Sequence, residues 1–173
     1  MKGRRVKGEE RLTQAVLANS DAVLAYLRRR VNPEDAADLL GETFLVAWRR
    51  INELPREPER ARMWLFGIAR GTLRNHVRGT QRRLALAESL RGKLKAAGVS
   101  PGADAGIEVR DAISRLDPVH AELVRLVHWE KMTIAEASEI IGIPASTGRT
   151  RYQRAREQLQ RSLSVSLPSG DAQ

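Results

Sequence analysis

The segment from Thr133 to Leu159, TIAEASEIIGIPASTGRTRYQRAREQL, constrains the fold of this chain more than any other segment. Thr133 and Glu136 have the spacing of a capping box, which begins a helix, and Gly142 with the following Ile-Pro ends one. A second helical pattern follows Pro144. The segment therefore predicts two helices joined by a tight turn, the layout of a helix-turn-helix that reads DNA in the major groove.

The second of these predicted helices is rich in arginine. It contains only one acidic residue, Glu157, and five arginines: Arg149, Arg151, Arg154, Arg156 and Arg161. Guanidinium groups present a fixed fork of donors that fits guanine edges and phosphates. A solvated basic helix in a bundle is the alternative, because charge runs often lie on surfaces. The whole chain favours DNA, since 30 Lys and Arg residues against 21 Asp and Glu residues give a net charge of +9.

The composition favours helices throughout the chain. Hydrophobic residues make up 42% of it and aromatic residues only 4%, and Ala, Leu, Arg and Glu recur in long runs. We expect an all-α protein of two small helical domains, because 173 residues can close two modest cores. The lack of Cys excludes disulfides and thiolate zinc sites. Without an apolar run of about 20 residues, we expect no membrane insertion and a cytoplasmic protein.

Proline, glycine and loss of periodicity divide the chain. We expect a first domain over 1–79, a flexible linker over 80–106, a second domain over 107–163 and a disordered tail over 164–173. A partly helical stretch before Gly98 is the alternative for the first part of the linker. Apolar spacing predicts helices over about 10–31, 33–51 and 59–78. The last of these has an apolar side of Leu65, Ile68, Ala69, Leu73 and Val77 and a cationic side of Arg70, Arg74 and Arg78. Gly67 and Gly71 share the cationic side, where either close approach of another backbone or simple tolerance explains them.

No set of reactive side chains indicates catalysis. The three histidines, His76, His120 and His128, lack metal-ligand spacing. The chain also lacks an HExxH motif, a nucleophile elbow and a phosphate-cradling glycine loop. We therefore expect neither enzymatic activity nor a bound cofactor.

Three segments, residues 38–49, 61–71 and 116–159, carry the remaining marked motifs: DLLGETFLVAWR, ARMWLFGIARG and the helix-turn-helix with the helix before it. Together they resemble the extracytoplasmic-function (ECF) sigma factors of bacterial RNA polymerase, members of the sigma-70 family. Residues 38–49, DLLGETFLVAWR, are similar to the D-L-V-Q-E-T-F-L-x-A-W-R signature of their region 2.2. Residues 61–71, ARMWLFGIARG, resemble the x-R-x-W-L-Y-R-I-A-R-N segment that follows it, and residues 116–159 resemble region 4. The resemblance implies a region 2 domain, a linker and a region 4 helix-turn-helix domain.

The same resemblance implies a promoter-specificity subunit and assigns side chains to its partners. The helix that docks on the β′ clamp coiled coil of the polymerase core is expected to use Asp38, Glu42 and Arg49. The −10 element and its separated strand are expected to contact Asn52, Arg62, Trp64, Arg70, Arg74, Asn75 and Arg78. The −35 element is expected to contact Ser146, Thr147, Arg149, Thr150, Arg151, Gln153 and Arg154. An anti-sigma factor that covers the polymerase-binding surfaces is a further expected partner.

Several of these assignments have alternatives. Asp38 and Glu42 also fit an ordinary pair of surface acids four residues apart, and we expect Trp48 to be a core anchor. The apolar residues Leu123, Leu126 and Val127 are expected to build the core, with contact to the β flap as the alternative. A stand-alone helix-turn-helix regulator, which binds an operator without polymerase, is the alternative function.

Four glycines depart from the family pattern. Gly41 stands where the family has Gln, and Gly67 and Gly71 replace Arg and Asn beside the −10 pocket. Gly148 stands where an apolar Val usually packs the recognition helix. We expect the glycine at 148 to leave a smaller contact and a region 4 domain of marginal stability.

Overall fold

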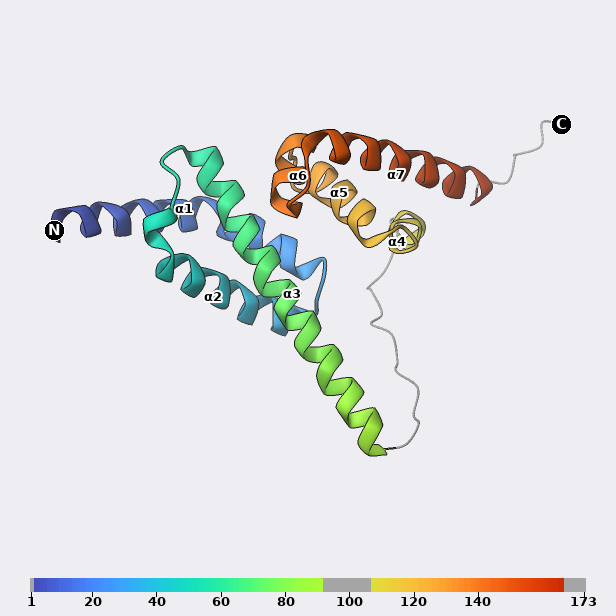
Figure 1. The fold of residues 1–173 in the computed structure, drawn as a ribbon, viewed down its shortest axis with the longest axis horizontal. Coiled ribbons are helices and arrows are strands. Elements are labelled where there is room, and N and C mark those ends of the chain that lie inside the picture. Colours follow the sequence, from blue (N-terminus) through green and yellow to red (C-terminus); the bar gives the residue numbers. More distant parts are fainter. Residues whose placement is uncertain (1, 92–106, 167–173) are drawn as a thin grey trace. The chain divides into compact units, whose positions relative to one another are not determined.

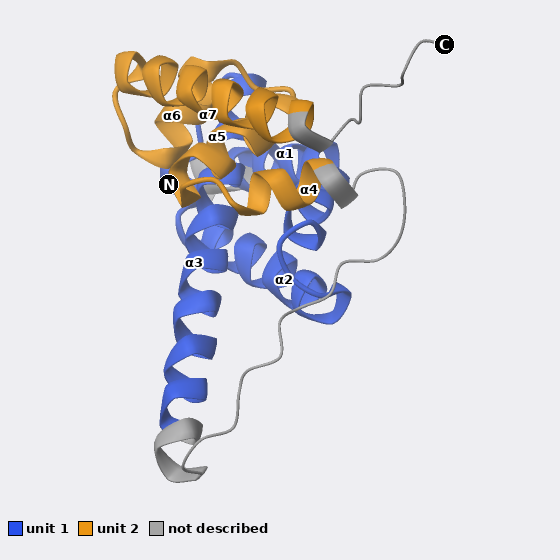
Figure 2. Cartoon of the chain, turned by 90° about the vertical axis from the view of Figure 1, so that its right-hand side faces the viewer, with its two compact units in different colours: residues 1–96 blue, residues 97–173 orange. Residues whose placement is uncertain are grey.

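The computed structural model of the chain describes residues 2–91 and 107–166, and the regular elements in these ranges are all helices (Figure 1). This confirms the predicted all-α class. The chain divides into two compact units, Met1–Ala96 and Ala97–Gln173 (Figure 2). Within the described ranges, no helix has the length and apolar character needed to cross a membrane.

The first unit contains α1 (Lys2–Arg28), α2 (Pro33–Arg49), the short 3₁₀ helix η1 (Ile51–Glu53) and α3 (Pro58–Arg91). Asn32 caps α2, because its side chain accepts a hydrogen bond from the backbone N–H of Asp35 at 2.8 Å. Pro33 follows in the first turn, where no backbone N–H is needed. The three long helices pack against one another in pairs, which buries their apolar faces in one core.

Two helices of this unit are longer than expected. α1 begins at Lys2 rather than near Glu10, and α3 ends at Arg91 rather than near Arg78. A single glycine, Gly79, costs only about 1 kcal/mol of helix propensity relative to Ala, and the residues after it are mostly good helix formers. The expected linker of residues 80–106 therefore begins inside α3, and its part from 92 to 106 lies outside the described residues.

The core of the first unit is centred on large side chains from α1 and α3. The ring of Tyr26 meets that of Phe66 edge-on, with centroids 5.4 Å apart, and both residues are fully buried. A second group of buried residues joins the three helices and η1: Leu12, Ala47, Leu54, Ala61, Leu65 and Ile68. The apolar side expected for α3 is buried through Leu73, but Val77 is 40% exposed because the helix has left the bundle there.

The inward face of α2 contains a polar residue that the apolar pattern did not indicate. Thr43 is fully buried, and its hydroxyl lies 2.6 Å from the carbonyl oxygen of Leu39 and 3.1 Å from the hydroxyl of Thr72 on α3. The hydroxyl of Thr72 lies 2.9 Å from the carbonyl of Ala69. Two hydroxyl protons serve these three contacts, so one contact lacks a proton at any moment.

The second unit contains α4 (Ile107–Ser114), α5 (Pro118–His128), α6 (Ile134–Ile141) and α7 (Ala145–Ser166). Asp117 caps α5 by accepting from the N–H of Val119 at 2.9 Å. α7 includes the first three residues of the expected tail, and residues 167–173 lie outside the described residues. The structure thus contains the helix-turn-helix that the capping residues predicted.

The core of this unit joins α7 to α4 and α5. Its buried residues are Ile113, Ala121, Val124 and Ala155, with Leu116, Trp129, Tyr152 and Leu159 packed against them. Leu123 and Leu126 are fully buried, so their expected place in the core is confirmed, and Val127 is half-buried. These contacts hold α7 by one side and leave its other side open.

The contact between α6 and α7 depends on Gly148. An added Cβ at this position would lie 1.8 Å from Oγ and 3.0 Å from Cβ of Ser138. Ser138 is fully buried, and its hydroxyl donates to the carbonyl of Ile134 at 2.6 Å. The smaller contact expected at Gly148 is therefore wrong, because the side chain of Ser138 fills the space that a larger residue would occupy.

Candidate nucleic-acid interface

The outward side of α7 carries polar and cationic side chains. Of the seven positions predicted to read DNA, Ser146, Arg149, Thr150, Gln153 and Arg154 are exposed, and Thr147 and Arg151 are half-buried. Positions 146, 149, 150, 153 and 154 share one side of a helix, and Gly148 and Ala155 lie buried on the other. The structure therefore brings most of the predicted residues together on one open face.

The arginines of this face make no side-chain contact of charge or hydrogen bonding with the described residues. In the described part of the chain, no hydrogen bond or ion pair involves the side chains of Arg149, Arg151 or Arg154. Gln153 is held by Glu157, to which its amide donates at 3.1 Å. Guanidinium groups with no internal partner remain available for guanine edges and phosphates.

Local interactions fix how α7 is presented. The reciprocal capping box of Thr133 and Glu136 begins α6, with the N–H of Thr133 donating to the Glu136 carboxylate at 2.7 Å. Gly142 ends α6 in the left-handed region, at a φ of 83°. The hydroxyl of Tyr152 lies 2.9 Å from Nε2 of His128, which links α7 to the end of α5. The turn and this link together orient α7 on α5 and α6.

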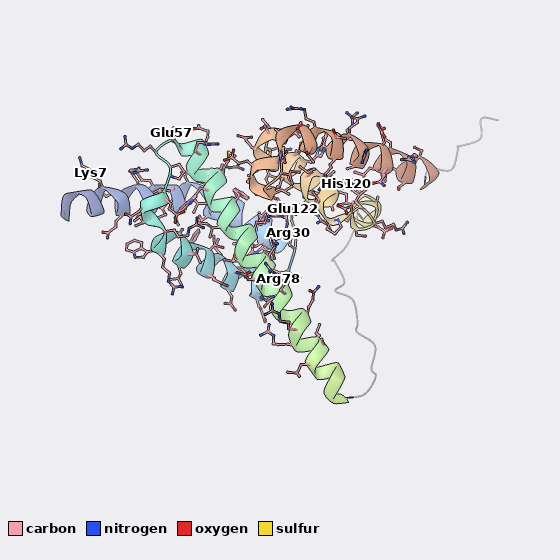
Figure 3. All side chains as sticks on the ribbon, in the orientation of Figure 1. Lys7, Arg30, Glu57, Arg78, His120 and Glu122 are labelled. Carbon is pink, nitrogen blue, oxygen red and sulfur yellow. The ribbon has the colours of Figure 1, made fainter. Side chains whose placement is uncertain are left out.

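A second cationic face lies on α3. Arg74, Asn75 and Arg78 are exposed, and Arg70 is half-buried. Arg78 lies where α3 emerges from the bundle (Figure 3). An added Cβ at Gly67 or Gly71 would meet no atom within 4 Å, so the described part of the chain does not approach these glycines closely. Two explanations were open for Gly67 and Gly71: close approach of another backbone, or simple tolerance of glycine in the helix. Close approach of another segment within the described residues is excluded.

The two other α3 residues predicted at the −10 element are closer to the core. The guanidinium carbon of Arg62 lies 4.9 Å from the ring centroid of Phe66, in a cation–π contact. The indole of Trp64 is half-buried against the residues that join the three helices and η1. Its Nε1 is buried and has no hydrogen-bond partner, which is an unusual state for an indole N–H.

Asn52 is held in place by its neighbours in and around η1. The guanidinium of Arg50 binds the carboxylate of Glu53 through two contacts, of 3.0 and 2.5 Å. The hydrogen bonds from Arg50 hold the pKa of Glu53 below its usual value, and those same bonds raise the pKa of Arg50. Arg11 of α1 donates to the carbonyl oxygens of Leu54 at 3.0 Å and Pro55 at 2.6 Å. Asn52 is thereby presented, exposed, on a braced loop.

The outward side of α2 forms a third open surface. Asp38, Glu42 and Arg49 are exposed there, and no ion pair or hydrogen bond of their side chains occurs among the described residues. Leu45 is 59% exposed and Trp48 is 47% exposed on the same side. The expectation that Trp48 is a core anchor is wrong, because the adjacent Ala47 occupies the inward position.

Leu45 and Trp48 are surface residues that the sequence interpretation missed. They lie on the side of α2 opposite to Ala36, Thr43 and Ala47, as a rotation of 100° per residue predicts. The signal was therefore present in the periodicity of α2. An aliphatic and an aromatic side chain beside unpaired charges make this surface typical of a protein-binding site.

The fold and its open faces define a class, that of two-unit helical proteins with a helix-turn-helix in one unit and an exposed apolar and charged helix face in the other. Comparisons with known proteins agree with it. The family model of Sigma-70 region 2 matches residues 15–83, and that of Sigma-70 region 4 matches residues 107–159. The chain is 30% identical over 158 residues to the ECF RNA polymerase sigma factor SigC of Mycobacterium tuberculosis, with 88% of this chain and 84% of SigC covered.

The chain belongs to the ECF sigma factors, which are transcription initiation factors and not enzymes. It is also 30% identical over 151 residues to the ECF RNA polymerase sigma factor BldN of Streptomyces coelicolor. That match covers 83% of this chain but only 57% of BldN. The family resemblance identified from residues 38–49, 61–71 and 116–159 is thus confirmed.

Solved structures show the same fold. The sigma factor RpoE from Bartonella quintana, in complex with the anti-sigma factor NepR, is similar with a TM-score of 0.68 and 23% identity. That match covers 88% of this chain and 96% of RpoE. CnrH, in complex with the cytosolic domain of CnrY, is similar with a TM-score of 0.63 and 24% identity over 91% of this chain and 90% of CnrH.

Proposed function

We propose that this ECF sigma factor binds the core of bacterial RNA polymerase through the outward side of α2. Asp38, Glu42 and Arg49 have no ion-pair or hydrogen-bond partner among the described residues, and they supply charge complementarity to a clamp coiled coil. Leu45 and Trp48 supply the apolar area that a stable contact needs. This open surface is the observation that carries the proposal, because exposed apolar side chains beside charged ones fit docking on a partner protein.

The second part of the proposal is that α7 reads the −35 element. Arg149, Arg151 and Arg154 form no ion pair within the described part of the chain, and α7 lies at the recognition position of a helix-turn-helix. Polar side chains on the same face, at positions 146, 147, 150 and 153, add donors and acceptors for base edges. The β flap of the polymerase core is proposed to support this unit from a separate surface.

The third part is that η1 and α3 open and hold the −10 element. Separating a duplex costs free energy at every unstacked step, and the protein offsets that cost by holding bases and phosphates of a single strand. Arg70, Arg74 and Arg78 supply cations for the phosphates, and Asn52 and Asn75 supply exposed amides for bases. Arg62 and Trp64 are proposed to line the entrance, where a base edge would satisfy the buried indole N–H.

Control by an anti-sigma protein is the fourth part. The structure of RpoE from Bartonella quintana was solved in complex with the anti-sigma factor NepR. The structure of CnrH was solved in complex with the cytosolic domain of CnrY. A protein that covers Leu45 and Trp48 would block access to the polymerase core. Because transcription takes place in the bacterial cytoplasm, the proposal places the active protein there.

A binding measurement separates this function from that of an operator-binding regulator. The affinity of the full chain is measured for purified core polymerase and, separately, for random duplex DNA. A sigma factor binds the core tightly and duplex DNA alone weakly. The paired variant Asp38→Ala/Glu42→Ala should weaken core binding at least tenfold, and Arg28→Ala, which removes an exposed arginine from α1, should leave it unchanged. Tight binding of particular duplexes with no affinity for the core would refute the proposal.

A further inference from the structure

A row of four arginines runs along α3 and continues past the helical bundle. Arg70, Arg74, Arg78 and Arg82 follow one another at intervals of four residues, so each lies about 6 Å along the helix axis from the next and on nearly the same side. Leu86 occupies the next position and ends the row. Figure 1 shows this part of α3 extending beyond α1 and α2 as a single helix.

The last three arginines of the row keep their charge open to solvent. Arg74, Arg78 and Arg82 are exposed, and in the described ranges no carboxylate pairs with any of the three. The Nε of Arg78 donates to the carbonyl of Arg74 at 3.3 Å, which leaves its terminal nitrogens available. The sequence of α3 contains only two acids, Glu59 and Glu88.

The extension has no role in the core of the first unit. The side chains from Gln81 to Leu86 are all exposed, including Leu84 at 51% and Leu86 at 63%. An isolated helix of this length gains little from propensity alone, so the extension is costly unless a partner covers it. Three exposed arginines with no paired carboxylate among the described residues favour a polyanion as that partner over a protein.

We propose that Arg82, with Arg78, binds phosphates of the duplex spacer between the −10 and −35 elements. The inference rests on the proposed function, which places the −10 element along α3 and the −35 element on the unit that follows in the chain. From Arg74 to Arg82 the row is about 12 Å long, and phosphates of one strand recur about every 3.4 Å along a duplex axis. The row therefore spans roughly three to four base-pair steps.

The test pairs a change in the protein with a change in the DNA. Holoenzyme is assembled from core polymerase and the full chain, and it binds a promoter fragment selected by transcription from a random library. In a second fragment, neutral methylphosphonates replace the spacer phosphates next to the −10 element. The protein variants are Arg82→Ala, which keeps a strong helix former, Arg82→Lys, which keeps the charge, and Arg28→Ala as an exposed control.

Arg82→Ala should lower promoter affinity roughly three- to tenfold and reduce the slope of log K against log salt by about 0.9. The methylphosphonates should weaken binding of wild type, Arg82→Lys and Arg28→Ala, and should weaken binding of Arg82→Ala less, because only the contact of Arg78 is then left to lose. Additive losses would overturn the proposal, as would weaker binding of Arg82→Ala to core polymerase without DNA. A wild-type chain that forms no promoter-specific complex would instead refute the proposed function.

Discussion

Replacing Gly148 by alanine tests how α6 and α7 are held together. In an open helix this change stabilises by about 1 kcal/mol, because alanine has the higher helix propensity. Here the new Cβ would lie 1.8 Å from Oγ of Ser138, and overpacking of this kind costs about 1–3 kcal/mol. Rotation of the hydroxyl away from Gly148 would break its 2.6 Å hydrogen bond to Ile134, which costs about 1 kcal/mol more. The net expectation is destabilisation by about 1–3 kcal/mol.

Hydrogen exchange of the full chain, followed by mass spectrometry, measures this change locally. Peptides from α6 and α7 should exchange roughly 5- to 150-fold faster in Gly148→Ala, and peptides from α1 to α3 should not change. Adding Ser138→Ala removes the clashing oxygen and should restore most of the protection. Gly71→Ala is the matched control, since its Cβ meets no atom within 4 Å and should slow exchange in α3. Equal or slower exchange in Gly148→Ala, or no rescue by Ser138→Ala, would refute the packing argument.

Three further predictions concern the first unit. The lowered pKa of Glu53 means that its pairing with Arg50 stabilises η1 above the unfolded pKa and that this stabilisation is lost as pH falls through the folded pKa. The protection factors of the η1 amides, which correct for the slower intrinsic exchange at low pH, should therefore fall on acidification, and Glu53→Gln should remove that fall. Trp48→Ala should weaken binding to core polymerase at least tenfold while leaving the urea midpoint of unfolding unchanged; a shifted midpoint with normal binding would make it a core residue. Thr43→Val should cost about 0.5–1.5 kcal/mol in urea unfolding, because its contacts with Leu39 and Thr72 are lost; adding Thr72→Val should cost a similar further amount, because the hydroxyl of Thr72 still donates to Ala69 in the single variant.

Local sequence patterns predicted the ends of several helices because their causes are local. Asn32 and Asp117 cap α2 and α5 with their own side chains, and the box of Thr133 and Glu136 needs only four consecutive residues. Gly142 adopts the left-handed conformation that ends α6. The helix-turn-helix and the open face of α7 followed directly from these signals.

Features that depend on tertiary contacts were predicted less well. The match between Gly148 and Ser138 joins two helices, and neither residue alone indicates the other. The end of α3 was placed too early, because a lone glycine at 79 is a weak stop signal without a following proline. Trp48 was assigned to the core from its residue type, although the rotation of α2 places it outside. The periodicity of α2 thus predicts the exposure of this aromatic side chain better than its residue type does.

The central claim is that this chain directs the polymerase core to promoters, and transcription tests it most directly. Purified core polymerase is combined with the full chain on a library of random DNA fragments, and the 5′ ends of the RNA products are sequenced. The predicted result is a set of discrete start sites that share two upstream motifs. These start sites should be absent with core polymerase alone and lost with the variant Asp38→Ala/Glu42→Ala. The account would be contradicted if core polymerases from several bacteria gained no promoter-specific start sites from this chain, while the chain alone bound particular DNA duplexes.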